Sequence, residues 1–392
     1  MAKKEFPDSR RAKKDAIGME KRGSSPGLFE QPRLRLTAGP LVAVLAFLII
    51  GAGGCRTEDA PAPEPTVLQR IVVPPVGYYY HSVYPGGVTG AEDDITAADV
   101  DAYENAVGHR VAWVYFSHNW YNGRAFPSAT ADWIRARGSV PFIRLMLRSN
   151  CDQDVAEPLF TLQAIASGAF DADLRAWGAA ARAFATALIV EWGTEMNGRW
   201  FSWNGVWNGG PGEGPRRFRE AFRRIVGIIR GQGASNITWV FHVNDGDDPQ
   251  KEWNRLENYY PGDDVVDWLG VSVYGAQTPL DDEWPIFTKG LDAVAPRIMA
   301  LAPDKPLFVL EFGVSAGNPL GKPSQWADAA LSSILANRWP RIRGFSWWNE
   351  RWENDDNPKH NTNMQVQNVP GLAEVFRRRL ASGNILERPI LE

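Results

Sequence analysis

The stretch LIVEWGTEMNGRWFSWNG, Leu188 to Gly205, opens with apolar residues of strand length and continues into a turn-prone, aromatic-rich segment. Its polar and aromatic residues include Glu195, Asn197, Arg199, Trp200, Phe201 and Trp203. Sugars offer apolar faces for stacking and hydroxyl groups for hydrogen bonds, and carboxylic acids assist the cleavage of their acetal bonds. A carboxylate at the end of a strand beside aromatic rings therefore favours chemistry on a sugar. The alternative is a core strand followed by a structural loop.

On both sides of this stretch, strand-length apolar runs alternate with helical patterns. The expected strands are Gly77–Tyr84, Val111–Phe116, Val140–Leu147, Ala187–Val190, Ile237–Val243, Trp268–Tyr274, Leu307–Leu310 and Gly344–Trp348. The helical patterns are Ala97–Val107, Ala129–Arg137, a double one over Leu159–Ala185, Pro215–Arg230, Ile286–Ala302, Gln325–Asn337 and Leu372–Ala381. Eight strands alternating with helices over about 300 residues predict an α/β fold, a (β/α)8 TIM barrel. A doubly wound sheet is the competing fold, but no glycine-rich phosphate loop follows the first strand.

A second carboxylate follows the seventh expected strand. The segment KPLFVLEFGVS, Lys305 to Ser315, is a short apolar strand that ends at Glu311. Strands four and seven face each other across the mouth of an eight-stranded barrel, so Glu195 and Glu311 are expected to meet there. Two carboxylates about 5–5.5 Å apart are the arrangement of a retaining glycoside hydrolase. The alternative is that both glutamates are structural.

Four stretches of the chain resemble glycoside hydrolase family 26, the β-mannanase family. They are GTEMNGRWFSWNG, ASNITWVFHVND, YYPGDDVVDWLGVSVYG and KPLFVLEFGVS, and the likeness spans roughly residues 140–348. The family belongs to a clan of (β/α)8 barrels with catalytic glutamates after strands four and seven. The resemblance implies that Glu195 is the acid/base, that Glu311 is the nucleophile, and that Tyr274 hydrogen-bonds the nucleophile.

The chain departs from the family pattern at two positions close to the expected acid/base. The family usually has a histidine immediately before the acid/base and an arginine four residues before it, where this chain has Thr194 and Glu191. In the family these residues help hold the acid/base and contact the sugar, so their replacement bears on the choice of glycan more than on the chemistry. Glu191 is itself expected to contact the substrate, and an inward-pointing Glu191 would repel the charge of Glu195.

Several other side chains are expected to contact the sugar. Trp347, just before the long polar segment that follows the eighth strand, is the expected platform beneath the sugar at the cleavage point. The remaining expected contacts are Trp200, Phe201, Asn197 and His118. For each aromatic residue the alternative is a filler of the core or of a loop, and for His118 it is a hydrogen bond within the rim.

Residues 1–54 have the pattern of a membrane-targeting leader. A segment dotted with Lys and Arg ends at Arg35, an uncharged apolar stretch follows, and small residues precede Cys55. This pattern predicts a bacterial lipoprotein signal with Cys55 acylated after cleavage, and an uncleaved membrane anchor is the alternative. Residues 55–75 are rich in proline and acid and are expected to form a disordered linker, which leaves 76–392 as the hydrolase domain. Either alternative tethers the domain to the membrane, in the cell envelope or on its extracellular face.

Charge and cysteine content limit the partners. The chain has a net charge of −4 although its leader is basic, so the domain is more acidic still, which argues against nucleic acid. A disulfide between Cys55 and Cys151, the two cysteines of the chain, is the alternative to acylation of Cys55. The five histidines are scattered, and no Cys/His group has metal-ligand spacing. We therefore expect no cofactor and no metal, and a monomer.

Together these features predict a retaining glycoside hydrolase that cleaves a β-linked polysaccharide, above all an endo-β-mannanase. One alternative is another β-glycanase, acting on β-1,3-xylan, mixed-linkage glucan or an exopolysaccharide. A second alternative is a carbohydrate-binding lipoprotein without catalysis. A third is a transglycosidase, in which a sugar replaces water as the acceptor.

Overall fold

The structure is a computed structural model that describes residues 67–87 and 92–392. The expected lipoprotein signal and its acylated Cys55 lie outside the described residues and stay predictions. Within the described ranges, no helix is both long enough and apolar enough to cross a bilayer.

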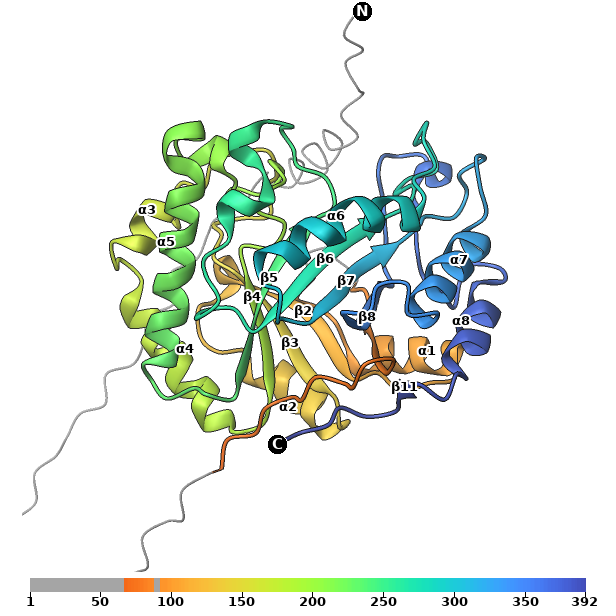
Figure 1. Cartoon of the computed structure of the whole chain (residues 1–392), viewed down its shortest axis with the longest axis horizontal. Coiled ribbons are helices and arrows are strands. Elements are labelled where there is room, and N and C mark those ends of the chain that lie inside the picture. The colour runs from red at the N-terminus through yellow and green to blue at the C-terminus, as the bar shows by residue number, and fades with distance from the viewer. Residues whose placement is uncertain (1–66, 88–91) are drawn as a thin grey trace, which may run out of the picture. The chain divides into compact units, whose positions relative to one another are not determined.

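Eight parallel strands form a closed barrel (Figure 1). They are β1 (Tyr79–Tyr84), β2 (Trp113–Asn119), β3 (Val140–Met146), β4 (Leu188–Trp192), β5 (Ile237–Asn244), β6 (Trp268–Tyr274), β7 (Leu307–Gly313) and β8 (Ile342–Trp348). Each strand pairs in parallel with the next, and β1 also pairs with β8, which closes the sheet. The predicted (β/α)8 barrel is therefore confirmed.

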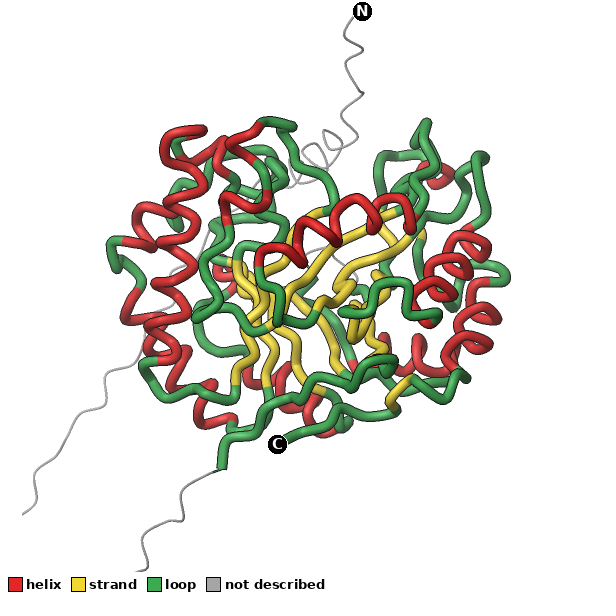
Figure 2. The backbone as a smooth tube through the Cα atoms, viewed as in Figure 1, coloured by secondary structure: helices red, strands yellow, loops and turns green. Residues whose placement is uncertain are grey.

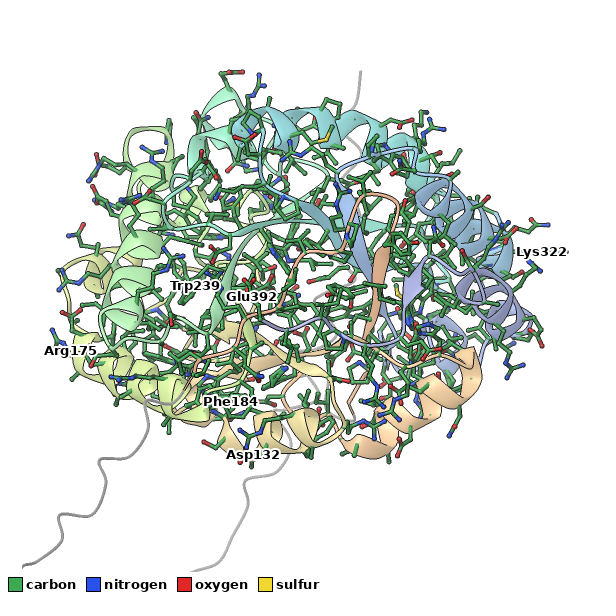
Figure 3. The ribbon with its side chains drawn as sticks, turned by 60° about the horizontal axis from the view of Figure 1, so that its bottom comes forward. Asp132, Arg175, Phe184, Trp239, Lys322 and Glu392 are labelled. Carbon is green, nitrogen blue, oxygen red and sulfur yellow. The ribbon has the colours of Figure 1, made fainter. Side chains whose placement is uncertain are left out.

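The helices form a shell around the strands, as the tube in Figure 2 shows. They are α1 (Ala97–Val107), α2 (Ser128–Ala136), α3 (Leu162–Ala166), α4 (Asp171–Phe184), α5 (Gly210–Arg230), α6 (Phe287–Leu301), α7 (Pro323–Leu335) and α8 (Leu372–Leu380). The double helical pattern of the sequence thus corresponds to two helices, α3 and α4. Figure 3 shows charged side chains of this shell, such as Arg175 and Lys322, pointing outward. The shell keeps the apolar strands out of water on their outer side.

Three very short strands complete the sheet structure of the described residues. They are β9 (Arg351–Trp352), β10 (Thr362–Asn363) and β11 (Ile385–Leu386). β9 and β10 form an antiparallel pair in the long segment after β8, and β11 pairs with the start of β1. The segment after β8 is therefore folded back on itself.

Four aromatic rings fill the N-terminal half of the barrel interior. They are Trp113, Phe142, Trp268 and Phe308, with Trp268 stacked on Phe308 at a ring-centroid distance of 4.0 Å and Trp113 5.9 Å from Phe308. All four are fully buried. Because large rings close this half, polar side chains that point inward from the strands gather in the C-terminal half, where barrel enzymes have their sites.

The folded domain begins earlier than the sequence predicts. The backbone N–H groups of Arg70 and Val72 donate to the carbonyls of Glu392 and Ile390, each at 2.9 Å. Ile71, between them, is buried. The prediction of a disordered linker up to residue 75 is therefore wrong for residues 67–75, because the apolar residues of this segment pack against the chain's C-terminal segment.

Candidate active site

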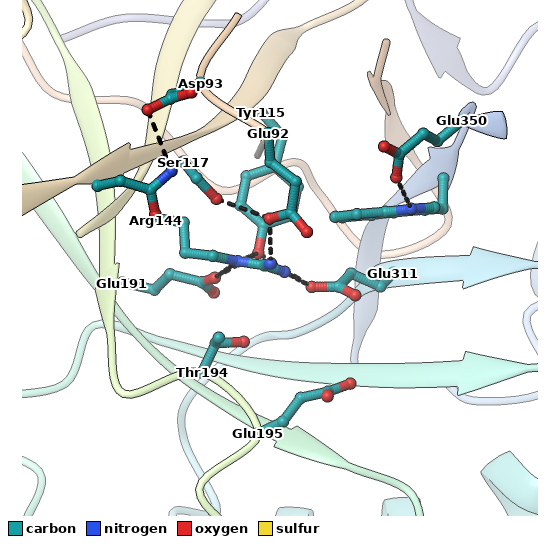
Figure 4. Close-up of polar contacts among 12 residues, drawn as sticks. Glu92, Asp93, Tyr115, Ser117, Arg144, Glu191, Thr194, Glu195, Glu311 and Glu350 are labelled. Atoms are coloured by element: carbon teal, nitrogen blue, oxygen red, sulfur yellow. Dashed lines mark hydrogen bonds and ion pairs between the residues drawn. The ribbon is translucent and has the colours of Figure 1, made fainter. Parts of the chain in front are cut away.

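Glu195 lies in a tight turn that follows β4. Its backbone φ of 48° lies in the left-handed region, where residues other than glycine are uncommon. The turn is fixed on both sides, because the N–H of Glu195 donates to the carbonyl of His242 at 2.9 Å and its own carbonyl accepts from Gly198 at 2.8 Å. This geometry directs the carboxylate of Glu195 toward the mouth of the barrel (Figure 4).

Two neutral donors hold the carboxylate of Glu195. The indole Nε1 of Trp200 donates to Oε2 at 2.8 Å, and the side-chain amide of Asn244 donates to Oε1 at 3.0 Å. A Cβ on Gly198 would lie 2.1 Å from the ring of Trp200, so the indole reaches Glu195 only because this residue is glycine. Trp200 therefore lies in the site, where the sequence predicts it, and its observed contact is with the acid/base candidate.

Glu311 owes its inward direction to a bulge in β7. Val309 pairs with Val271 of β6, but the next pair joins Glu311 to Ser272, so Leu310 is an extra residue. In a regular strand, neighbouring side chains point to opposite faces. The bulge allows both Leu310 and Glu311 to face the interior, and bulges often re-aim side chains in this way beside active sites.

Three side chains contact the carboxylate of Glu311. The hydroxyl of Tyr274 donates to Oε2 at 2.8 Å, and the hydroxyl of Tyr115, which is shared with Oε1 of Glu191, lies 3.1 Å from Oε1 of Glu311. The guanidinium of Arg144 contacts Oε1 as well. The predicted hydrogen bond from Tyr274 is confirmed. Arg144 makes the environment of Glu311 cationic, unlike that of Glu195.

The two carboxylates share one barrel mouth. Burial and then the charge of Glu195 raise the pKa of Tyr274 well above its usual value, and Tyr274 is the residue that bonds Glu311. Burial would lower the pKa of Arg144, but the negative groups around it, Glu195 among them, raise it. Figure 4 shows both glutamates, one after strand four and one in strand seven, facing the same mouth. Their role as a catalytic pair stays a prediction.

Glu191 lies inside the barrel wall and is fully buried. Its carboxylate accepts from Nε of Arg144 at 3.1 Å and lies 2.7 Å from Nδ1 of His242. Burial would raise the pKa of Glu191, but His242 and Arg144 lower it. The prediction that Glu191 contacts the substrate is wrong for this arrangement, because its oxygens are taken up within the wall.

Thr194, the other departure from the family pattern, belongs to the same group of contacts. Its hydroxyl lies 3.0 Å from Nδ1 of His242. The side chains of Glu191, His242 and Glu311 bring potential metal-ligand atoms within 4.8 Å of one another. The guanidinium of Arg144 already bonds both carboxylates, so it supplies the positive charge that these ligands attract.

Neighbouring tryptophans of β8 point to opposite sides of the barrel. Trp347 packs against Phe312 and Phe376, is fully buried, and donates its Nε1 to the carbonyl of Met364 at 2.8 Å. The prediction that Trp347 is the sugar platform is therefore wrong. Trp348 faces the site instead, stacked on Tyr84 at 4.0 Å and 5.2 Å from the guanidinium of Arg144.

Three other expected contacts serve the scaffold. His118 points toward the helical shell and accepts from Nε1 of Trp177 at 3.3 Å, and burial lowers its pKa to about 4. Asn197 is fully buried, and its amide donates to the carbonyls of Asn244 and Gly246 at 2.9 and 3.2 Å. Phe201 stacks on Trp203 at 4.5 Å and is buried in the core. The predictions of sugar contacts for His118, Asn197 and Phe201 are therefore wrong.

The structure adds Glu92 and Tyr115, which sequence reasoning did not select. It also gives contacts in the site to Arg144, Asn244 and Trp348, which the sequence places at strand ends without a specific role. Tyr115 and Arg144 lie on inward-facing positions of their strands, so the alternation of side chains along each strand is the signal that marks them. Glu92 lies in the segment between β1 and α1, and its carboxylate bonds Arg144 at 2.8 Å. No strand pattern marks Glu92.

Two cavities, each of about 390 Å³, both have Asp245 in their lining. One is lined by Tyr274, Trp284 and Lys289, and the other by Lys251, Arg255 and Arg297. Burial and the charge of Glu195 raise the pKa of Asp245 to about 6. The cavity beside Trp284 therefore reaches Tyr274, which bonds Glu311.

A closed (β/α)8 barrel with glutamates at the ends of strands four and seven defines a class, the glycoside hydrolases of this fold. Residues 188–303 match the sequence family described as Glycosyl hydrolase family 26. This match supports the resemblance to the family over the segment from β4 to just after α6.

Two curated relatives match parts of this chain. The chain is 22% identical over 312 residues to Endoglucanase H of Acetivibrio thermocellus, covering 79% of this chain and 31% of that protein. It is 26% identical over 151 residues to Beta-1,3-xylanase TXYA of a Vibrio species, covering 38% of this chain and 28% of that protein. The chain thus spans about a third of the length of these relatives.

Solved structures share the fold. A modular endo-β-1,4-mannanase from Cellulomonas fimi matches with a TM-score of 0.58 and 23% identity, covering 80% of this chain and 72% of that one. The family 26 β-mannanase BoMan26A from Bacteroides ovatus matches with a TM-score of 0.56 and 18% identity, covering 79% and 90%. At these identities the likeness supports the architecture.

Proposed function

We propose that this protein is a retaining glycoside hydrolase that cleaves β-linked mannan from within the chain. The observation that carries the proposal is the contrast between two carboxylates in one mouth: Glu311 is bonded by a guanidinium and two phenols, and Glu195 by two neutral donors. A nucleophile must be ionised, whereas an acid/base must gain and lose a proton in each cycle. The two environments suit these two roles.

In the proposed first step, a carboxylate oxygen of Glu311 attacks the anomeric carbon and forms a glycosyl ester. The bond from that carbon to the glycosidic oxygen breaks, and the leaving oxygen takes the proton of Glu195. In the second step, water attacks the anomeric carbon and gives a proton to Glu195. The ester bond breaks and Glu311 becomes a carboxylate again, so the sugar keeps its configuration.

Mannan is the proposed substrate because the solved structures named above are mannanases. The curated relatives are named for glucan and β-1,3-xylan cleavage. The choice among these glycans therefore rests on the comparisons, and the two glutamates serve any of them equally.

The proposal is tested by incubating the domain from residue 67 with β-mannan, mixed-linkage β-glucan and β-1,3-xylan. We expect manno-oligosaccharides of several lengths at early times, with the new reducing ends first released in the β configuration. If oligosaccharides are released only from mixed-linkage β-glucan, or only from β-1,3-xylan, that glycan replaces mannan as the proposed substrate. Initial release of the α-anomer would contradict double displacement. No product from any of the three, with glycan still bound, would support the non-catalytic alternative.

A further inference from the structure

Arg144 and Glu191 lie directly opposite each other on neighbouring strands. The parallel register of β3 and β4 pairs these two residues, and both side chains point into the barrel. Their side chains are 4% and 0% exposed. Burying two charges costs several kcal/mol per ion in protein interiors, and their attraction compensates only if the geometry and the other hydrogen bonds are good.

The three nitrogen atoms of the Arg144 guanidinium contact different partners. Nε binds Glu191 at 3.1 Å and the hydroxyl of Tyr115 at 2.9 Å, while Nη1 binds Glu92 at 2.8 Å. Nη2 contacts Glu311. Since the guanidinium is a rigid planar fork, fixing its Nε edge also fixes the direction of Nη2. Figure 4 shows Arg144 lying between Glu191 and Glu311.

Glu191 is in turn fixed from its other side. Nδ1 of His242 lies 2.7 Å from Oε2 of Glu191, and Nε2 of His242 lies 2.8 Å from the hydroxyl of Ser272. Ser272 is the register partner of Glu311. A chain of polar contacts therefore runs from Glu311 through Arg144, Glu191 and His242 to the strand position beside Glu311.

We propose that Glu191 is a positioning residue for the nucleophile, acting through Arg144, although Glu191 touches neither the substrate nor Glu311. The proposal rests on the role proposed above for Glu311. The competing explanation is that Arg144 and Glu191 only neutralise each other in the wall. A purely neutralising pair can be replaced by apolar residues of similar volume without chemical consequence, whereas a positioning pair cannot.

The decisive substrate carries a leaving group that departs without a proton. We choose the 2,4-dinitrophenyl β-glycosides of mannobiose and cellobiose, because their first step needs the nucleophile and not the acid. On these probes R144M/E191L should keep its fold but lose about 10²- to 10³-fold in kcat, the size of effect seen when one preorganised donor is removed. E191Q should lose about 10²-fold through misplacement of the guanidinium.

A charge exchange distinguishes positioning from neutralisation. R144E should be inactive. R144E/E191R restores an ion pair but places its guanidinium one strand away, so it should recover the melting temperature of the wild type without recovering its kcat. If E191Q does not fold, E191D replaces it in the test because it keeps the negative charge. We expect E191D to have a lower kcat than the wild type at a similar KM. The matched control is E104Q, which breaks the buried Glu104–Arg137 pair (2.8 Å) far from the glutamates. It should lower the melting temperature and leave kcat unchanged.

The proposal is overturned if R144M/E191L, or E191Q and E191D, fold and turn over the activated substrates within threefold of the wild type. It is also overturned if R144E/E191R turns over the activated substrates within threefold of the wild type, because a pair that only neutralises charge can be exchanged between the two strands. Failure of the proposed function has a different signature, namely E311Q retaining normal turnover. In that case Glu311 is not the nucleophile, whatever Glu191 does.

Discussion

The two sides of the barrel mouth hold the same kind of side chain in opposite ways. Glu311 comes from a strand and is gripped by Arg144, Tyr115 and Tyr274 from three other strands. Glu195 comes from a turn with a left-handed backbone and is held by Trp200 and Asn244. One carboxylate is embedded among charges in the wall, and the other is held at its rim by neutral groups.

This difference teaches how one fold obtains two functions from two glutamates. A cation beside a carboxylate favours its ionised form, and neutral donors favour it much less. The wall side is also built from strands, which hold a nucleophile more firmly than a turn does. The acid/base must change its protonation state twice in each cycle, so a less charged setting suits it. The sharpest tests set one side of the mouth against the other.

Removing each carboxylate should give the largest and the most distinct effects. We expect E311A to lose at least about 10⁴-fold in kcat on every substrate, since no covalent step can start. E195A should lose about as much on polysaccharide, but on a dinitrophenyl glycoside its kcat/KM should fall much less, because the leaving group needs no proton in the first step. Added azide should give a β-glycosyl azide with E195A and an α-glycosyl azide with E311A, which product analysis by NMR distinguishes. The same azide anomer from both variants would contradict the assignment of roles.

Variants of the two neighbouring tryptophans of β8 test which of them belongs to the active site and which to the core. W348F should lower kcat/KM about 10- to 10²-fold, because Trp348 stacks on Tyr84 and lies against Arg144. W347F should leave kcat/KM near the wild-type value and cost about 1–3 kcal/mol of stability through the lost bond to Met364 and poorer packing. Steady-state kinetics and denaturant unfolding of both variants measure this. A fall in activity with W347F at unchanged stability would restore Trp347 as a sugar platform.

Trp347 and Trp348 also show what the sequence could and could not predict. The barrel, its strand order and the meeting of strand ends four and seven followed from apolar runs and their spacing. Choosing between two adjacent tryptophans required the register of β8, in which Trp348 pairs with Tyr84 and therefore shares its inward face. That register was available only from the folded chain.

The wall side of the site was less predictable than the rim. Glu311 reaches the interior through a bulge, which breaks the alternation on which strand patterns depend. The role of Arg144 depends on its ion pairs with Glu191, Glu92 and Glu311. These residues are far apart in sequence, so no local pattern predicts the pairs. Glu195 and Trp200, by contrast, lie five residues apart in one turn, so a local pattern was enough to place both in the site.

Single hydrogen bonds on the two sides should have similar sizes and different signatures. Y274F removes a donor to Glu311 and W200F removes a donor to Glu195, and each should lower kcat/KM on polysaccharide about tenfold, as for a bond to a charged group. On a dinitrophenyl glycoside the loss should persist for Y274F and largely disappear for W200F. Measuring both variants on both substrates gives the comparison directly. Equal losses on the activated substrate would show that Trp200 serves more than proton transfer.

The smallest expected effect comes from Asp245, the carboxylate beside Glu195 at the rim. Its pKa is raised to about 6 by burial and by Glu195. Between pH 4 and 6 the folded protein therefore binds more protons at this site than the unfolded chain, so the free energy of unfolding falls as the pH rises and stays lower above pH 6. D245N removes this penalty, and we expect about 1–2 kcal/mol of added stability at pH 7 and almost none at pH 4.

Asp292 provides a control of opposite sign for Asp245. The bond from Arg338 holds the pKa of Asp292 below its usual value, so its contribution is present at pH 7 and is lost as the pH falls through that lowered pKa. D292N should therefore leave the stability at pH 7 unchanged or slightly lower, where D245N raises it. Denaturant unfolding of both variants at pH 7 and pH 4 tests this contrast. If D245N does not raise the free energy of unfolding at pH 7, the carboxylate of Asp245 is solvated in the folded protein. Burial then does not destabilise its charged form.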